Sequence, residues 1–256
     1  MTERTSGDER RQALEERTSA NRPGALAAQL LTAVRFLTLA PPGGAAAAPL
    51  GESALFFPVV GLALGAALVA LDAALAAVAP AAVRAVLVVA LLAAATAGRH
   101  LAGVARLAGA ARGRAGAPGV LGVLAAGVLV AAEVAAVARL GDAVRATALL
   151  LAPALGRWAM VALAFGSRTA GRTAEDAALR GIKFREFAGA SVLALGMALA
   201  WAEARGLVAA VALALAIIGC RVGAHRVAGG VTAPLVDTVG LVGETLAFGI
   251  FGIAAT

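Results

Sequence analysis

The sequence predicts an all-α, polytopic integral membrane protein: a helical bundle that crosses the bilayer about seven times. Hydrophobic residues make up 61% of its 256 residues and charged residues only 14%, and the mean hydropathy is +0.89. Soluble domains carry roughly 25% charged residues, which form their water-facing shell. Several apolar runs here instead approach the ~20 residues that a helix needs to cross the hydrocarbon core. The formal net charge of +7 comes mostly from arginines between those runs, as the positive-inside rule expects of cytoplasmic loops.

The chain divides into a short polar tail and one membrane domain. Residues 1–25 mix acidic and basic side chains, and we expect a disordered cytoplasmic tail there. The acidic residues also argue against a cleaved signal peptide. Residues 26–256 are expected to form the membrane-embedded domain. It starts with an apolar segment, 26–39, which reaches only about 20 Å as a helix, so we expect a short half-inserted or interfacial helix.

Seven longer apolar runs predict the spans. They cover residues 53–79, 82–97, 117–138, 144–166, 187–202, 206–220 and 239–255. Alanine and glycine dominate these runs, and small residues let membrane helices approach one another closely. The pair Gly61 and Gly65 is typical of such contacts.

Basic residues gather in three connections, each separated from the next by two spans. The three groups are Arg99, Arg106, Arg112 and Arg114; Arg168, Arg172, Arg180, Lys183 and Arg185; and Arg221 and Arg226. An even number of spans places all three connections on one side of the membrane, and the positive-inside rule makes that side cytoplasmic. Such a face would also suit a phosphorylated substrate, because guanidinium groups bind phosphate bidentately. Topology alone also accounts for these charges.

Other classes of protein are excluded by what the sequence lacks. Nucleic-acid binding needs a basic soluble face, usually with exposed aromatics, and this chain has no Tyr and only two Trp. Its single cysteine, Cys220, excludes an internal disulfide and a cysteine metal site. We expect Cys220 to be a small buried residue.

Two ionisable residues fall within apolar runs, where burial of charge is costly and indicates function. Arg157 either belongs to a functional site or snorkels toward the helix end. Glu133 is expected to pair with an arginine.

Six short segments form a pattern along the chain. They are RFLTLAPP at 35–42, FFPVVGLALGA at 56–66, TAGRHLAG at 96–103, GRAGAPGVLGVLA at 113–125, LAPALGRWAMVALA at 151–164 and GGVT at 229–232. In order and spacing they resemble the adenosylcobinamide-GDP ribazoletransferases, the cobalamin synthase family. The resemblance implies a polytopic membrane enzyme that joins α-ribazole, or its 5′-phosphate, to adenosylcobinamide-GDP and releases GMP with the help of Mg²⁺.

The resemblance also implies candidate site residues. The candidates for catalysis are His100, Arg114, Arg157 and Glu244, and those for substrate binding are Gly98, Gly103, Gly116, Gly229, Gly230 and Thr232. His100 matches the family histidine, which would orient a nucleophile or donate to phosphate; packing or capping at a helix end is an equal alternative. Glu244 falls where the family has a glutamate, and His225 matches no family residue.

This chain departs from the family where the family holds its carboxylates. Ala102, Arg106 and Gly109 stand in place of three aspartates, and Arg112 replaces a fourth. In the last motif, GGVT is followed by Ala and Pro instead of Gly and Asp. Mg²⁺ binds oxygen ligands and usually one or two carboxylates. The family expectation of Mg²⁺ is therefore doubtful here, no residue is assigned as a metal ligand, and catalytic activity stays open.

Two functions of different class follow. One is a phosphoryl-type transferase of the cobalamin synthase family, acting on adenosylcobinamide-GDP and α-ribazole. The other is a non-catalytic homologue in the bilayer that binds a corrinoid, a nucleotide or a partner subunit, either a second copy of this chain or another membrane protein of the cobalamin pathway. A transporter is disfavoured because the sequence shows no pair of interrupted helices in matching halves.

Overall fold

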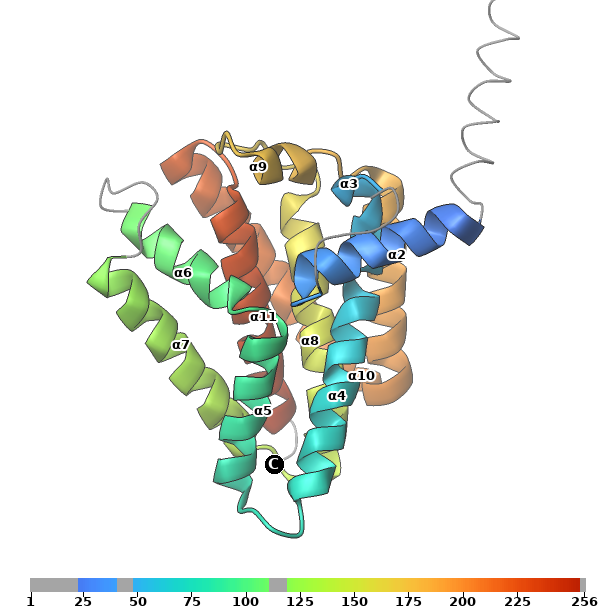
Figure 1. The fold of residues 1–256 in the computed structure, drawn as a ribbon, viewed down its shortest axis with the longest axis vertical. Helices are drawn as coiled ribbons and strands as arrows, with labels where there is room; N and C mark the ends of the chain where they lie inside the picture. The colour runs from blue at the N-terminus through green and yellow to red at the C-terminus, as the bar shows by residue number, and fades with distance from the viewer. Residues whose placement is uncertain (1–22, 41–47, 111–118, 254–256) are drawn as a thin grey trace, which may run out of the picture.

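The computed structural model describes residues 23–40, 48–110 and 119–253, and they form a bundle of helices (Figure 1). The elements are α2 (Pro23–Leu37), α3 (Leu50–Ser53), the 3-10 turn η1 (Ala54–Phe56), α4 (Phe57–Leu75), α5 (Ala81–Ala95), α6 (Arg99–Ala110), α7 (Val120–Ala138), α8 (Asp142–Ala164), α9 (Ala174–Leu179), α10 (Phe184–Ala228) and α11 (Ala233–Ile253). The described ranges contain no β-strand beyond an isolated bridge between Thr169 and Val231. The all-α membrane class is confirmed.

The number of membrane passages depends on how two bent elements are counted. Five described helices are long and apolar enough to cross a membrane, and the bent pair α5–α6 raises the number to six. α10 doubles back at Glu203, whose φ of 49° and ψ of −129° interrupt the helix. Counting each half of α10 as a passage accounts for the difference from the expected seven. The predicted turn between residues 202 and 206 is where the reversal occurs.

α8 is the central helix of the bundle (Figure 1). Nearly all of it is buried, and α4, α10 and α11 pack around it. Small residues make this possible: a Cβ atom at Gly61 or Gly65 of α4 would collide with the α8 backbone near Pro153 and Leu150. The predicted close contact of Gly61 and Gly65 is therefore with α8.

The outward faces of the peripheral helices carry large apolar side chains. Val120, Val128 and Val192 are 78%, 68% and 72% exposed, and similar residues continue along α7 and α10. In water such a surface would be unfavourable, whereas lipid tails solvate it well. This surface agrees with a multi-pass membrane protein.

The short N-terminal helix is α2, which has 15 residues. At ~1.5 Å per residue it is about 22 Å long, less than the hydrocarbon core. It lies across the bundle near α3 and α4, close to the end where α9 lies (Figure 1). Residues 23–25, expected in the tail, already belong to α2, and the rest of the predicted tail lies outside the described residues.

The described parts of the three basic connections lie toward one end of the bundle, together with α9 and the start of α11 (Figure 1). The boundaries of the first and third connections differ from those expected from the sequence. The first connection is mostly helical, because α6 leaves α5 at an angle of 80°. Arg221 and Arg226 lie within α10, which continues to Ala228, and Arg221 donates to the carbonyl oxygens of Ala162 and Phe165 at the end of α8.

Candidate functional site

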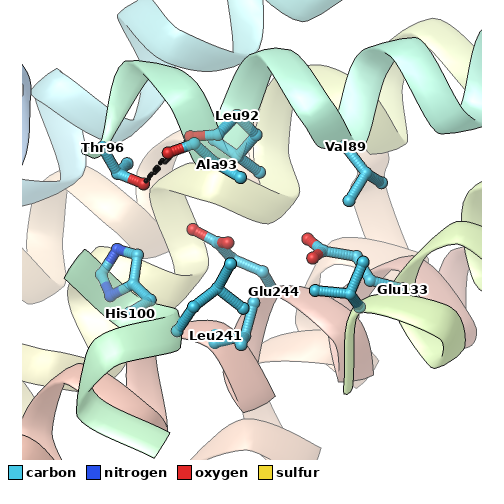
Figure 2. Close-up of a pocket in the computed structure, with 10 residues that line it drawn as sticks. Val89, Leu92, Ala93, Thr96, His100, Glu133, Leu241 and Glu244 are labelled. Atoms are coloured by element: carbon cyan, nitrogen blue, oxygen red, sulfur yellow. Dashed lines mark hydrogen bonds between the residues drawn. The ribbon is translucent and has the colours of Figure 1, made fainter. Parts of the chain in front are cut away.

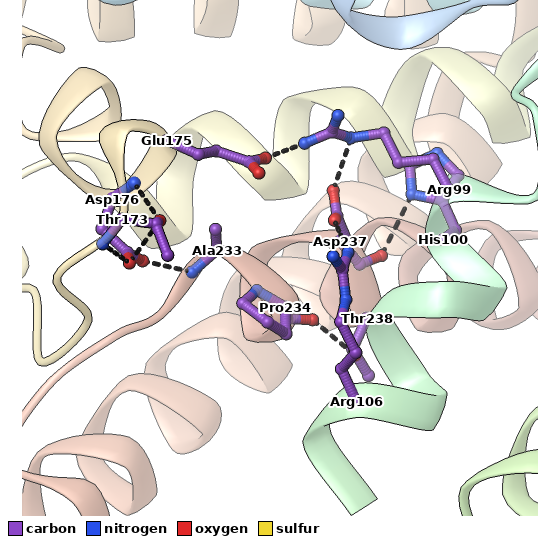
Figure 3. A network of polar contacts seen from close by, with 10 residues as sticks. All are labelled: Arg99, His100, Arg106, Thr173, Glu175, Asp176, Ala233, Pro234, Asp237 and Thr238. Atoms are coloured by element: carbon purple, nitrogen blue, oxygen red, sulfur yellow. Dashed lines mark hydrogen bonds and ion pairs between the residues drawn. The ribbon is translucent and has the colours of Figure 1, made fainter. Parts of the chain in front are cut away.

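The candidate site is the junction where α6 crosses the first turns of α11 (Figure 3). Arg99, Gly103 and Arg106 share one face of α6, because residues four and seven apart lie in line on a helix. Gly103 has no side chain to hold α11 away: a Cβ there would lie 2.5 Å from the Cβ of Asp237. Asp237 therefore sits between the two arginines, with Arg99 Nε 2.9 Å from Oδ1 and Arg106 Nη2 3.5 Å from Oδ2.

Arg99 also ties the junction to two other elements. Its Nη2 atom forms an ion pair with Glu175 of α9. Its guanidinium carbon lies 3.8 Å from the centroid of the Phe36 ring in α2, a cation–π contact. Four segments far apart in the sequence are therefore joined through one arginine. Both arginines reach the surface, since their side chains are 22% and 41% exposed.

His100 lies directly beneath this junction and is only 3% exposed. Its Nδ1 atom is 3.1 Å from the backbone carbonyl oxygen of Asp237. Gly240 makes room for the ring, because a Cβ at this position would lie 3.1 Å from two ring atoms. His100 therefore fixes α6 against α11, and its Nε2 atom is buried without a hydrogen-bond partner.

Arg157 and Glu244 form an ion pair at the centre of the bundle. Both residues are fully buried, so Arg157 does not snorkel to the membrane surface. Gly156 provides the space, because a Cβ on it would collide with the Glu244 side chain. Arg157 keeps two donor nitrogens without hydrogen-bond partners, and Glu244 Oε2 has none either.

A small cavity lies beside Glu244 (Figure 2). Its volume is about 20 Å³, and His100, Glu133 and Glu244 line it together with apolar side chains. Glu133 is 2% exposed. It forms no ion pair within the described part of the chain, so the expected direct pairing with an arginine is absent there. The positive charge of Arg157 interacts with Glu133 electrostatically, without a direct contact.

Asp176, in the first turn of α9, is a buried acidic residue with a structural role that the sequence analysis did not identify (Figure 3). It caps two helices: Thr173 donates to Oδ2 through its backbone at 2.9 Å and its hydroxyl at 2.6 Å, and the Ala233 N–H donates to Oδ1 at 2.7 Å. Burial acts to raise its pKa, but these hydrogen bonds and the charge of Arg180 outweigh burial, and the pKa lies below its usual value. The Thr-Ala-Glu-Asp spacing of a capping box was the available signal.

The glycines predicted to bind substrate have structural roles. Gly98, with a φ of 63°, follows Ala97, with a φ of 54°, in the turn that bends α5 into α6. Gly229, with a φ of 73°, ends α10, as is usual for glycine after a helix. Gly230 leaves no room for a Cβ against the Arg168 carbonyl oxygen. The Thr232 carbonyl oxygen accepts from Leu235 and Val236 and starts α11.

The predicted catalytic residues divide into two groups. His100, Arg157 and Glu244 lie close together under the junction. Arg114 and Gly116 lie outside the described residues. The sequence did not predict that Arg99, Glu133 and Asp237 complete the same region, because each is brought there by contacts between distant helices.

The residues at the junction do not fit Mg²⁺. In the described ranges, no group of three or more His, Cys, Asp or Glu side chains is placed to hold a metal ion. Asp237 already faces two guanidinium groups, and Glu244 faces Arg157. These positive charges repel a cation strongly where the dielectric constant is low.

Comparison with known proteins gives the family. The chain matches the family described as cobalamin-5-phosphate synthase over residues 29–254. It is similar to the adenosylcobinamide-GDP ribazoletransferase of Roseiflexus sp. (strain RS-1), with 30% identity over 198 residues, 69% of this chain and 71% of the relative. No solved structure matches the chain. The resemblance seen in six short segments is thus confirmed over almost the whole bundle, and the chain belongs to the cobalamin-5-phosphate synthase family.

Proposed function

We propose that this chain binds adenosylcobinamide-GDP at the junction of α6 and α11 and joins α-ribazole, or its 5′-phosphate, to it with release of GMP. The observation that carries the proposal is the pair of surface-reaching arginines, Arg99 and Arg106, on either side of Gly103. Guanidinium groups bind phosphate oxygens bidentately, and a pyrophosphate offers two phosphoryl groups. The substrate is that of the family to which the chain belongs.

The substrate would lie on the outer end of the bundle. The cavity of about 20 Å³ beneath the junction has room for a water molecule and not for a corrinoid. At the junction, the pyrophosphate would compete with Asp237 for the two arginines. An oxygen of α-ribazole would form a bond to the phosphorus next to cobinamide while the bond to GMP breaks. Arg99 and Arg106 would stabilise the negative charge that GMP carries away.

His100 and the Arg157–Glu244 pair would then be positioning residues. They lie below the arginines and are buried, with exposures of 3%, 0% and 0%. His100 holds the first turns of α11, and therefore Asp237, against α6. The Arg157–Glu244 pair holds the middle of α11 against α8. This arrangement supports a role in shaping the anion site rather than in contacting the substrate.

A second function is favoured by the absence of a metal-ligand cluster in the described residues. In this alternative the chain binds the corrinoid nucleotide, or a partner subunit, without transferring ribazole. Positive charge at Arg106, where the family has an aspartate, favours binding of the pyrophosphate and disfavours a metal-assisted reaction. The two functions share the anion site and differ in turnover.

Two measurements test the proposal. The first is growth without added cobalamin of a strain that lacks its own cobalamin synthase and expresses this chain. The second is binding of adenosylcobinamide-GDP to the purified chain and to Arg99→Ala, Arg106→Ala and the control Arg205→Ala. Arg205 is exposed and lies just after the Glu203 bend, away from the junction.

We expect binding to weaken at least tenfold in the two junction variants and to be unchanged in Arg205→Ala. Growth together with this binding pattern supports the transferase. Binding without growth, from protein present in the membrane, supports the non-catalytic homologue. Equal binding by all four proteins would overturn the assignment of the site to α6 and α11.

A further inference from the structure

The small cavity beneath the junction has the properties of a site for a single buried water molecule. Its volume of about 20 Å³ exceeds the ~10–15 Å³ that one water requires. Buried polar atoms without hydrogen-bond partners occur on three of its lining residues: His100 Nε2, Glu133 Oε1 and Glu244 Oε2. The three residues come from α6, α7 and α11, and Figure 2 shows Glu244 between His100 and Glu133. Buried water typically makes about three hydrogen bonds to such atoms.

The charges around the cavity do not balance if both glutamates are ionised. α7 contributes Glu133, α11 contributes Glu244, α8 contributes Arg157 and α6 contributes His100, while the lining residues of α5 are uncharged. A further charge close to His100, that of Arg99, is already paired with Asp237 and Glu175. One arginine therefore faces two carboxyl groups in the buried interior. An uncompensated buried charge is costly, and a buried group neutralises itself instead.

The contacts decide which carboxyl group keeps the proton. Glu244 forms the ion pair with Arg157, and this contact requires a carboxylate. Glu133 has no ion pair among the described residues and leaves Oε1 unsatisfied. A protonated Glu133 gains a hydroxyl donor and loses its charge. Glu133 is therefore the group that stays neutral.

His100 can accept that donor. The Asp237 carbonyl oxygen can only accept, so the 3.1 Å contact places the hydrogen of a neutral imidazole on Nδ1. Nε2 is then an acceptor, and it is the unsatisfied ring atom. A water between Glu133 and His100 would accept from the carboxyl group and donate to Nε2, with its second hydrogen directed to the Glu244 carboxylate.

We propose that the bundle holds one water and one proton in this cavity, with a neutral Glu133 bridged by the water to His100 and Glu244. The site lies within the membrane-embedded helices and is independent of ribazole transfer. The proposal therefore stands or falls separately from the proposed function.

Infrared spectroscopy of the full chain in lipid nanodiscs at neutral pH tests the proton. A protonated carboxyl group has a C=O stretch distinct from that of a carboxylate. We expect this band in the wild type and in the control Glu203→Gln, whose side chain is exposed. The band should disappear in Glu133→Gln, which keeps the size and hydrogen bonding of the side chain. It should also disappear in Glu244→Gln, because Glu133 then ionises to balance Arg157.

Ala93→Val tests the water. Ala93 lines the cavity, and two added methyl groups would displace the water, so the Glu133 band should move to higher frequency as its hydrogen bond is lost. A wild-type spectrum without the band, which does not depend on any variant folding, would overturn the proposal. A band that persists in Glu133→Gln, or one that does not move in Ala93→Val, would overturn the assignment to Glu133 or the water respectively.

Discussion

At the scale of single residues, the charges inside this bundle are held by partners on other helices. Asp72 illustrates the pattern at the end of α4, where Arg145 of α8 donates to both of its oxygens at 2.8 Å and Arg84 of α5 lies 3.0 Å away. Arg145 also donates to the Val137 carbonyl oxygen at the end of α7. One buried carboxylate thereby connects four helices, because each guanidinium presents several donors in fixed directions.

Asp176 gives a prediction about acid stability. Its hydrogen bonds favour the carboxylate and lower its pKa, so its contribution to stability is complete above the unfolded-state pKa of ~3.9 and is lost as pH falls through the lower folded value. Asp176→Asn should lower the free energy of unfolding at pH 7 by about 1.5–3 kcal/mol, the range for hydrogen bonds to charged groups. Thermal unfolding in detergent, followed by circular dichroism, measures this change.

The pH dependence separates this cause from a packing defect. The difference between wild type and Asp176→Asn should begin to shrink below pH ~4, where the carboxyl group is protonated in the unfolded state, and should be lost as the pH falls through the lower folded pKa. Asp142→Asn is the control, because Asp142 is exposed in the first turn of α8. A difference that stays constant at acid pH would show that the carboxylate charge is not what Asp176 contributes.

At the scale of secondary-structure elements, the contact between α4 and α8 depends on glycine. α8 is buried along almost its whole length, so its neighbours must approach its backbone. Gly65 does so most closely, since a Cβ there would collide with the Leu150 carbonyl oxygen. Backbone atoms cannot move aside as a flexible side chain can. The small residues of α4 therefore set the distance between the two helices.

Gly65→Ala should destabilise the bundle by about 1–3 kcal/mol, the usual cost of overpacking, even though alanine favours a helix over glycine by up to ~1 kcal/mol. Gly127→Ala on α7 is the matched control, because Gly127 is exposed and a Cβ there meets nothing within 4 Å. It should leave the melting temperature unchanged or raise it slightly. Equal melting temperatures for both variants would contradict the close α4–α8 contact.

At the scale of the whole molecule, the three basic connections should share one side of the membrane. They meet at one end of the bundle, where Thr169 pairs with Val231 and Arg99 with Glu175. The positive-inside rule predicts that this end is cytoplasmic. The test is labelling of single cysteines in a Cys220→Ala background, with cysteine introduced in place of Arg106, Arg172 or Arg226.

All three cysteines should react with a membrane-impermeant reagent only from the cytoplasmic side. A cysteine in place of Glu203, at the reversal of α10, should react only from the opposite side. Labelling of one basic connection from outside would show that the span count between connections is odd.

The charges at the junction of α6 and α11 also predict how the melting temperature responds to Mg²⁺. Arg106 places positive charge where the family has an aspartate, so the wild type should show no rise in melting temperature with Mg²⁺ beyond that caused by an equal ionic strength of NaCl. A ligand at a hundred times its dissociation constant would add ~2.7 kcal/mol. Restoring Ala102→Asp, Arg106→Asp, Gly109→Asp and Pro234→Asp together should create a Mg²⁺-dependent rise. A clear rise in the wild type would contradict the expected absence of a metal site.

Local patterns of sequence carried the prediction of the fold class and much of the topology. Hydrophobic runs of membrane length, a polar break at residues 203–205 and arginines concentrated in alternate connections are properties of short segments, and the bilayer acts on each segment directly. For the same reason, the absence of the family aspartates at Ala102, Arg106 and Gly109 is visible without any structure.

Only the tertiary structure decided which charges meet. Arg99 and Asp237 are 138 positions apart, and no local pattern indicates that Gly103 lets Asp237 enter between two arginines. The same holds for the pairing of Arg157 with Glu244 and for Glu133 beside them, which has no ion pair among the described residues. Burial of charge is costly enough that each group must find a partner, a proton or water, but which of these it finds depends on how several helices pack at once.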